Sequence, residues 1–227
     1  DIKSFFLEQG YCLIKGVFSK EEIDEIKKSF DLVEKKSIAK NQAIINSGKS
    51  FPGLKRRDDQ VLILGDLLAF REFKEFDFLI FNKKIVKIVK SLLGDQVCYF
   101  GESNMQSGTG DRGFHSDNRI SDRNNPSGED WIGRYPLIRI GLYLNDTRKY
   151  SGGVKIMPKS HKVATSNFKK GFIDVPSDIG DIVIWNFTTS HSGNVKKLKI
   201  FNNLSIHPRI EDFVPYWLEN HNPNKRR

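Results

Sequence analysis

The feature that most constrains the fold is a change in sequence character near residue 95. Before this point, apolar residues recur at helical spacing and several segments carry helix start and stop signals. After it, short apolar stretches are separated by turns rich in Gly, Pro and Asn. Helices followed by many short strands predict antiparallel sheets covered by helices rather than alternating strand–helix units.

The individual segments sharpen this prediction. Ser19 and Glu22 have the form of a capping box, and the helix after them has an apolar face. Helices are predicted at residues 1–10, from residue 19 onward, at 61–81 and at 82–94. Strands are predicted at residues 11–17, 97–106, 137–144, 181–187 and 200–207. Residues 37–60 and 107–135 are predicted to be polar loops, the second of them a mobile lid.

These elements predict a mainly β fold with flanking helices, a jelly-roll or cupin-like barrel. At 227 residues the chain fits a single domain spanning residues 1–227. Its N-terminal helices should occupy residues 1–94 approximately, and the β core residues 95–210 approximately. In the strand at 137–144, Ile138, Ile140 and Leu142 should share one face, with Arg139 and Tyr143 on the other.

Composition narrows the range of partners. The formal net charge is +9, but the Lys and Arg residues are scattered and accompany no nucleic-acid recognition motif. This pattern favours a solvated surface with a mild preference for anionic small molecules over nucleic acid. No apolar run is long enough to cross a membrane, so no membrane association is predicted. Two cysteines are too few for a disulfide framework, and a cytoplasmic setting is the default prediction.

One short motif suggests chemistry. His115 and Asp117 lie two residues apart, so in an extended segment both side chains point to the same side. His191, much later in the chain, is a third candidate ligand. Two His and one carboxylate form the facial triad that holds ferrous iron and leaves the opposite face open. The His-x-Asp spacing arises often by chance, so taken alone it favours a polar loop over a metal site.

Several segments, in order along the chain, form a recognisable set. They are Phe5-Phe6-Leu7-Glu8-Gln9-Gly10-Tyr11, Gly16-Val17-Phe18-Ser19, Phe114-His115-Ser116-Asp117-Asn118, Gly152-Gly153-Val154 through Pro158-Lys159-Ser160-His161-Lys162, and Gly180-Asp181-Ile182-Val183-Ile184-Trp185 running to His191-Ser192-Gly193-Asn194. This set resembles the phytanoyl-CoA dioxygenase-like family of Fe(II)/2-oxoglutarate oxygenases. The resemblance implies a double-stranded β-helix that holds Fe(II) through His115, Asp117 and His191. It also implies that 2-oxoglutarate and dioxygen are consumed, with release of succinate and CO2, while a C–H bond of a small-molecule substrate is attacked. Hydroxylation is the preferred outcome, but the same triad also supports desaturation, ring formation or epimerisation, and the sequence does not choose among them.

The sequence departs from the family pattern at one position. The family usually places an Arg about eleven residues after the distal His, where it binds the far carboxylate of 2-oxoglutarate. Here that position is Asn202. A buried carboxylate needs a cationic or multidonor partner, and Arg139 and Lys199 are the candidate replacements, with Arg139 preferred. Tyr143, on the same predicted face as Arg139, and Asn104, which precedes the metal motif, are further candidate cosubstrate contacts.

Other residues and other functions remain open at this stage. His161 is predicted to be structural, and Trp185 to belong to the core rather than to a substrate-binding wall. A cupin-like metal-binding module without oxygenase activity is the alternative that the missing Arg raises, and a buried cation facing the metal would argue against it. A nucleic-acid demethylase would require a contiguous basic groove leading to His115. A halogenase is disfavoured because such enzymes replace the carboxylate ligand, and Asp117 is present.

Overall fold

The computed structural model describes residues 1–47, 54–57, 61–65, 77–99, 103–107, 114–117, 137–147, 153–163 and 170–193. Its α-helices are α1 (Ile2–Gln9), α2 (Lys20–Ser47), α3 (Asp77–Ile80) and α4 (Lys83–Leu93), and η3 (Ser160–Lys162) is a short 3-10 helix. Its strands are β1 (Tyr11–Ile14), β2 (Leu54–Arg57), β3 (Val61–Gly65), β4 (Asn104–Ser107), β5 (Ile138–Leu142), β6 (Val154–Ile156), β7 (Ile173–Val175), β8 (Ile182–Asn186) and β9 (His191–Gly193).

Local signals account for the helix ends. Helix α1 stops at Gly10, whose φ of 80° is left-handed and whose N–H donates to the carbonyl of Phe6. The predicted capping box precedes α2: the Ser19 N–H donates to Glu22 Oε2 at 2.7 Å, and the Glu22 N–H donates to Ser19 Oγ at 3.3 Å. Among the described helices, none has the length and apolar character needed to cross a membrane.

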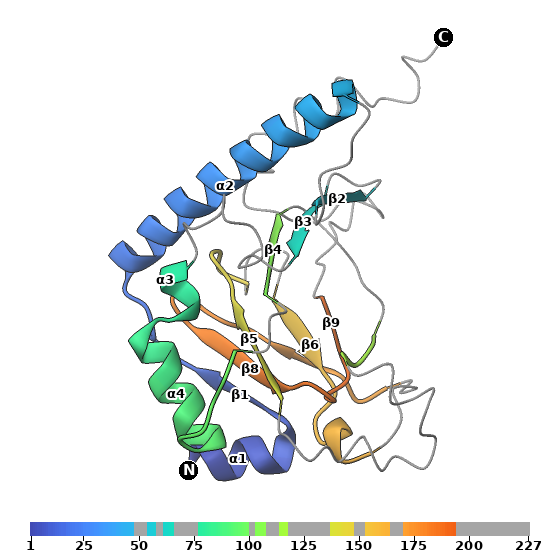
Figure 1. Cartoon of the computed structure of the whole chain (residues 1–227). Helices are drawn as coiled ribbons and strands as arrows, with labels where there is room; N and C mark the ends of the chain where they lie inside the picture. Colours follow the sequence, from blue (N-terminus) through green and yellow to red (C-terminus); the bar gives the residue numbers. More distant parts are fainter. Residues whose placement is uncertain are drawn as a thin grey trace.

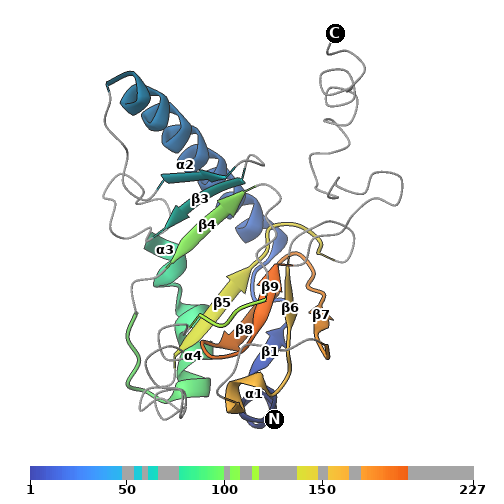
Figure 2. The ribbon, with the colours of Figure 1, turned by 90° about the vertical axis from the view of Figure 1, so that its right-hand side faces the viewer.

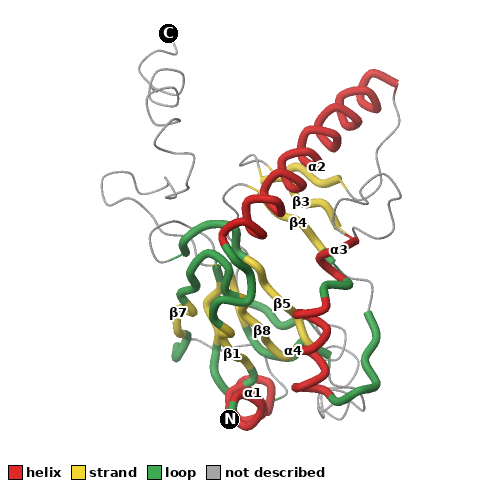
Figure 3. The backbone as a smooth tube through the Cα atoms, turned by 90° about the vertical axis from the view of Figure 1, so that its left-hand side faces the viewer, coloured by secondary structure: helices red, strands yellow, loops and turns green. Residues whose placement is uncertain are grey.

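The described strands form three antiparallel sheets of three strands each, with the orders β1-β8-β5, β2-β3-β4 and β7-β6-β9 (Figure 1 and Figure 2). Helices α1 and α4 lie on one side of the β1-β8-β5 sheet (Figure 3), and the β7-β6-β9 sheet lies on its other side (Figure 2). The β1-β8-β5 sheet is therefore the middle layer of this part of the molecule. The sheet-rich architecture with flanking helices matches the prediction.

Strand β8 lies at the centre of the hydrophobic core, because both of its faces are buried. Ile182 and Ile184 pack with the apolar residues of the helices, whereas Val183 and Trp185 pack with Val154 and the rest of β6. Side chains alternate along a strand, so one short segment contributes to two apolar clusters. A strand buried on both faces reads as the continuous apolar run seen in the sequence.

Strand β5 repeats this alternation beside β8. Ile138, Ile140 and Leu142 pack against the helix-side cluster, as predicted, and Tyr143 packs against the other one. The face that includes Arg139 is therefore turned toward the space between the two sheets. The β7-β6-β9 sheet encloses this space on the other side, and β9 contributes His191. Closure of the described strands into a complete barrel stays a prediction.

Three local predictions were wrong. Val61–Gly65, predicted as helix, is strand β3, because β2 and β4 hydrogen-bond to its two edges and this pairing overrides local preference. The predicted loop at residues 37–60 is shortened, since α2 continues to Ser47 and β2 follows at Leu54–Arg57. In the described part of the predicted strand at 97–106, residues 97–99 have no regular structure and β4 begins only at Asn104.

Candidate metal centre

Backbone pairing brings the two halves of the candidate centre together. The N–H of His115 donates to the carbonyl of His191 at 2.9 Å, and the N–H of His191 donates to the carbonyl of His115 at 2.8 Å. A further bond, from the N–H of Asp117 to the carbonyl of Phe187 at 3.1 Å, fixes the segment after His115. Residues separated by most of the β region are thus held side by side by main-chain contacts.

The three side chains converge from this arrangement. Asp117 Oδ1 lies 4.0 Å from His115 Nε2, and Asp117 Oδ2 lies 3.8 Å from His191 Nε2. One ligand atom from each residue falls within 4.8 Å of the other two, a spacing that can hold a metal ion. Their role as ligands stays a prediction.

His191 is prepared for ligation by its surroundings. Its Nδ1 lies 2.9 Å from the carbonyl of Thr189, which favours a proton on Nδ1 and leaves Nε2 facing the centre. Burial lowers the pKa of His191 below its ordinary value, although the charge of Asp117 acts in the opposite direction. The imidazole is therefore held in the neutral form that a metal ligand requires.

Arg139 points toward this cluster from β5. Its Nε donates to Asp117 Oδ2 at 2.9 Å, and its guanidinium carbon lies 5.3 Å from the centre of the Phe187 ring. The Arg139 side chain is only 22% exposed and that of Asp117 only 13%, so this ion pair is partly shielded from water. The predicted inward orientation of Arg139 agrees with this contact. Its role toward 2-oxoglutarate stays a prediction.

Tyr143 and Trp185 lie together beyond Arg139. A Cβ placed on Gly141 would lie 2.9 Å from the Tyr143 hydroxyl and 3.0 Å from Trp185 Cζ3, so both side chains occupy the space above this glycine. Burial raises the pKa of Tyr143, which keeps its phenol protonated. Trp185 belongs to the core, as predicted, but its ring centre is also 5.1 Å from that of His191. The sequence has no signal for this second contact.

Other predicted residues fall elsewhere. His161 lies away from the triad, where its Nε2 is 3.0 Å from the carbonyl of Leu7, in agreement with a structural role. Asn104 lies in β4, but its side chain is outside the described residues, as are Lys199 and Asn202. Most of the predicted lid at 107–135 and the predicted strand at 200–207 are also outside them.

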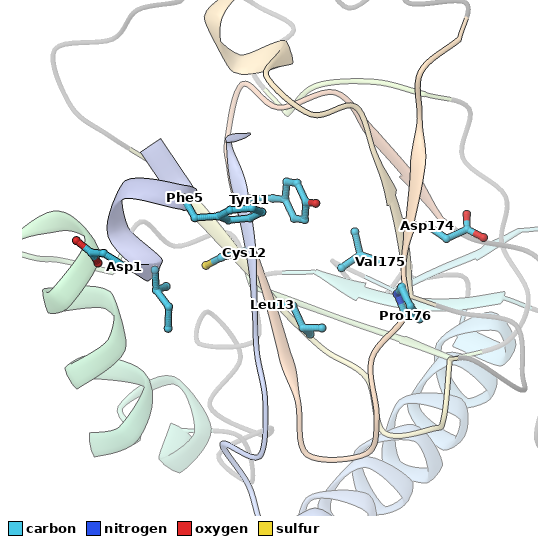
Figure 4. A pocket seen from close by; sticks show the side chains of 9 residues that line it. Asp1, Phe5, Tyr11, Cys12, Leu13, Asp174, Val175 and Pro176 are labelled. Carbon is cyan, nitrogen blue, oxygen red and sulfur yellow. The ribbon is translucent and has the colours of Figure 1, made fainter. Parts of the chain in front are cut away.

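A cavity of about 500 Å³ lies beside β1. Residues of α1, β1 and the end of β7 line it, including Phe5, Tyr11 and Val175 (Figure 4). Its carboxylates are those of Asp1 and Asp174, and it shares no residue with the triad. We therefore base no functional assignment on its size.

The residues around the triad fit a bound iron and an anionic cosubstrate. The donor set of two imidazoles and a carboxylate is the one that non-haem Fe(II) enzymes use. One buried polar atom near the triad, Trp185 Nε1, has no hydrogen-bond partner in the described structure. Buried polar groups are normally paired, so unpaired ones indicate a site that is completed by something bound.

Comparisons with known proteins show which family the chain belongs to. The family profile described as phytanoyl-CoA dioxygenase (PhyH) matches residues 6–195. A comparison with curated proteins gives no match. Among solved structures, the epimerase SnoN in complex with Fe3+, alpha ketoglutarate and nogalamycin RO is similar at 14% identity and a TM-score of 0.55, covering 85% of this chain and 75% of that one.

Two other similar structures come from named bacteria. AviO1 from Streptomyces viridochromogenes Tue57 has 13% identity and a TM-score of 0.60, with 85% of this chain and 86% of that chain covered. EvdO2 from Micromonospora carbonacea var. aurantiaca, complexed with 2-oxoglutarate, has 11% identity and a TM-score of 0.54, with 85% and 82% covered. At such identities these likenesses concern the fold.

The family profile and the His-Asp-His group together indicate an oxygenase or a related enzyme of the non-haem iron class. The chain belongs to the phytanoyl-CoA dioxygenase family, because the family profile covers most of its length. Iron and 2-oxoglutarate, the metal and cosubstrate predicted from the sequence, are those of this family and are present in similar structures.

Proposed function

We propose that this protein is an Fe(II)- and 2-oxoglutarate-dependent dioxygenase that hydroxylates a small molecule. Overall, substrate, dioxygen and 2-oxoglutarate would yield hydroxylated substrate, succinate and CO2, which balances all atoms. His115, Asp117 and His191 would hold the iron, since their ligand atoms lie within 4.8 Å of one another. The net charge of +9 favours an anionic substrate.

The observation that carries this proposal is the cation beside the triad. Asn202 replaces the Arg that usually binds the far carboxylate of 2-oxoglutarate, so a metal-binding module without oxygenase activity was a real alternative. A buried cation facing the metal was the feature expected to separate the two. Arg139, bonded to Asp117 Oδ2 at 2.9 Å and 22% exposed, is a partly buried cation beside the candidate ligands and supports the oxygenase.

The contacts around the candidate metal centre suggest a role for each of its residues. The Thr189 carbonyl orients His191 so that Nε2 faces the metal position. Arg139 holds Asp117 through one oxygen, which favours coordination through the other and keeps positions open for cosubstrate and dioxygen. Bound iron would supply dioxygen activation, with 2-oxoglutarate as the source of two electrons. The inter-sheet core beside Trp185 excludes water from the inner side of the centre.

The proposal includes a finer description of the fold. We infer that the strands belong to one double-stranded β-helix within a single domain over residues 1–227. The similar structures, with TM-scores of 0.54 to 0.60, support this topology. The β1-β8-β5 and β7-β6-β9 sheets would be its two walls, with the triad at the end where β9 meets the segment of His115.

Anaerobic titration tests the function directly. Fe(II) and 2-oxoglutarate added together should produce the weak visible charge-transfer band of a chelated 2-oxo acid, and neither alone should produce it. His191→Ala should retain no metal and give no band. His161→Gln is the matched control, because it removes a histidine outside the triad and should keep the band. Absence of the band in the native protein, or normal turnover by His191→Ala, would refute the proposal.

A further inference from the structure

The indole of Trp185 presents an unexplained donor. The side chain is only 7% exposed, and its Nε1 has no hydrogen-bond partner in the described part of the chain. An indole nitrogen can only donate, and a buried Trp usually finds an acceptor for this hydrogen. The neighbours of Trp185 in its cluster are aliphatic or aromatic, including Val154, Ile156 and Val183. Packing alone therefore does not explain why this position carries a nitrogen.

The position of Trp185 connects it to the metal centre. In the antiparallel pairing of β5 and β8, Trp185 is directly opposite Arg139, so the two side chains share a face. Arg139 contacts Asp117, and the Trp185 ring centre is 5.1 Å from that of His191. Cross-strand neighbours thus each approach a different member of the triad.

Two more residues lie on the same face, Gly141, which has no side chain, and Tyr143, whose hydroxyl is a neutral hydrogen-bond donor. Gly141 follows Arg139 on this face and adds no side chain, while the Tyr143 hydroxyl and Trp185 Cζ3 meet above it. The pKa of the Tyr143 phenol is raised by burial, so the group remains a donor. The face beside the triad therefore carries a cation and a phenol O–H next to the indole ring. This combination suits the oxygens of a carboxylate.

We propose that Trp185 Nε1–H donates a hydrogen bond to a carboxylate oxygen of 2-oxoglutarate bound at the triad. The inference rests on the proposed function and adds a residue to it. Without an Arg at position 202, the cosubstrate needs other donors, and Arg139 already directs its Nε to Asp117.

Trp185→Phe tests this role because it keeps an aromatic ring beside His191 and removes the N–H. In anaerobic titrations of the Fe(II) protein, this variant should bind 2-oxoglutarate about 10- to 100-fold more weakly, the typical effect of losing a hydrogen bond to a charged group. Its Fe(II) affinity without 2-oxoglutarate should change less than about threefold. Tyr11→Phe, a loss of one polar hydrogen on the other strand beside Trp185, should bind 2-oxoglutarate normally.

A second measurement uses the native chain and does not depend on the variant folding. In the Zn(II)-loaded protein labelled with 15N-indole, 2-oxoglutarate should shift the Trp185 N–H resonance downfield and slow its hydrogen exchange. Unchanged 2-oxoglutarate affinity in Trp185→Phe, or an unmoved Trp185 resonance, would overturn the inference while leaving the proposed function intact. A native protein that gives no charge-transfer band would instead overturn the proposed function itself.

Discussion

Replacing Arg139 tests the link between the triad and the cosubstrate. The contact from Arg139 Nε to Asp117 Oδ2 is 2.9 Å long, and neither side chain is more than 22% exposed. An exposed ion pair contributes at most about 1 kcal/mol, whereas a hydrogen bond to a charged, shielded group contributes about 1.5–3 kcal/mol. A contact of the same kind from Arg139 to the far carboxylate of 2-oxoglutarate would lose about 2 kcal/mol in Arg139→Ala, or roughly 30-fold in binding of 2-oxoglutarate.

The effect should depend on the shape of the side chain as well as on its charge. Arg139→Lys keeps a cation but loses the planar fork and the Nε donor, so it should recover only part of the affinity. Lys155→Ala is a matched control, because Lys155 lies 3.8 Å from Asp174 in an exposed pair on β6. It removes the same charge from the protein and should leave 2-oxoglutarate binding unchanged.

The measurement is the apparent dissociation constant of 2-oxoglutarate in the anaerobic Fe(II) protein. Fe(II) affinity without 2-oxoglutarate, measured in parallel, reports how Asp117 is positioned. Lys199→Ala should have a small effect. A large loss in Lys199→Ala with none in Arg139→Ala would refute the reasoning and assign the far carboxylate to Lys199. Equal affinities in all variants would mean that neutral donors alone bind the carboxylate.

Three further predictions concern the scaffold and the cysteines. Asp181 is 4% exposed, and its carboxylate accepts hydrogen bonds from the N–H groups of Gly16 and Asp178. In urea titrations, Asp181→Ala should lower the free energy of unfolding by about 2–4 kcal/mol and Asp181→Asn by less, and an unchanged unfolding midpoint would contradict this prediction. Gly180→Ala should lower the free energy of unfolding by about 2–3 kcal/mol, because φ is 93° and the new Cβ would clash with the Phe18 carbonyl oxygen. Gly16→Ala, with φ of 62° and open space around the new Cβ, should lower it by only about 1 kcal/mol, and equal losses in the two variants would argue against the steric explanation. Burial raises the pKa of Cys12 to about 11, so at pH 8 only about one Cys12 thiol in a thousand is ionised. Iodoacetamide should therefore label the exposed Cys98 and spare Cys12 until the pH approaches 11, and equal labelling rates at pH 8 would contradict this prediction.

The sequence by itself determined the elements that have strong local signals. The capping box at Ser19 and Glu22, the stop at Gly10 and the alternation along β5 all depend on residues within a few positions of one another. The order of the motifs also gave the family. Local signals failed at Val61–Gly65, where an aliphatic run suits helix and strand alike and pairing with β2 and β4 decides for the strand.

The tertiary structure decided which side chains meet. The sequence named His115, Asp117 and His191 as candidates, but their approach depends on two backbone bonds between His115 and His191. The contact of Arg139 with Asp117 and the place of Trp185 beside His191 depend on the register of β5 against β8. Register between strands far apart in sequence is set by packing of the whole sheet, so no single segment encodes it.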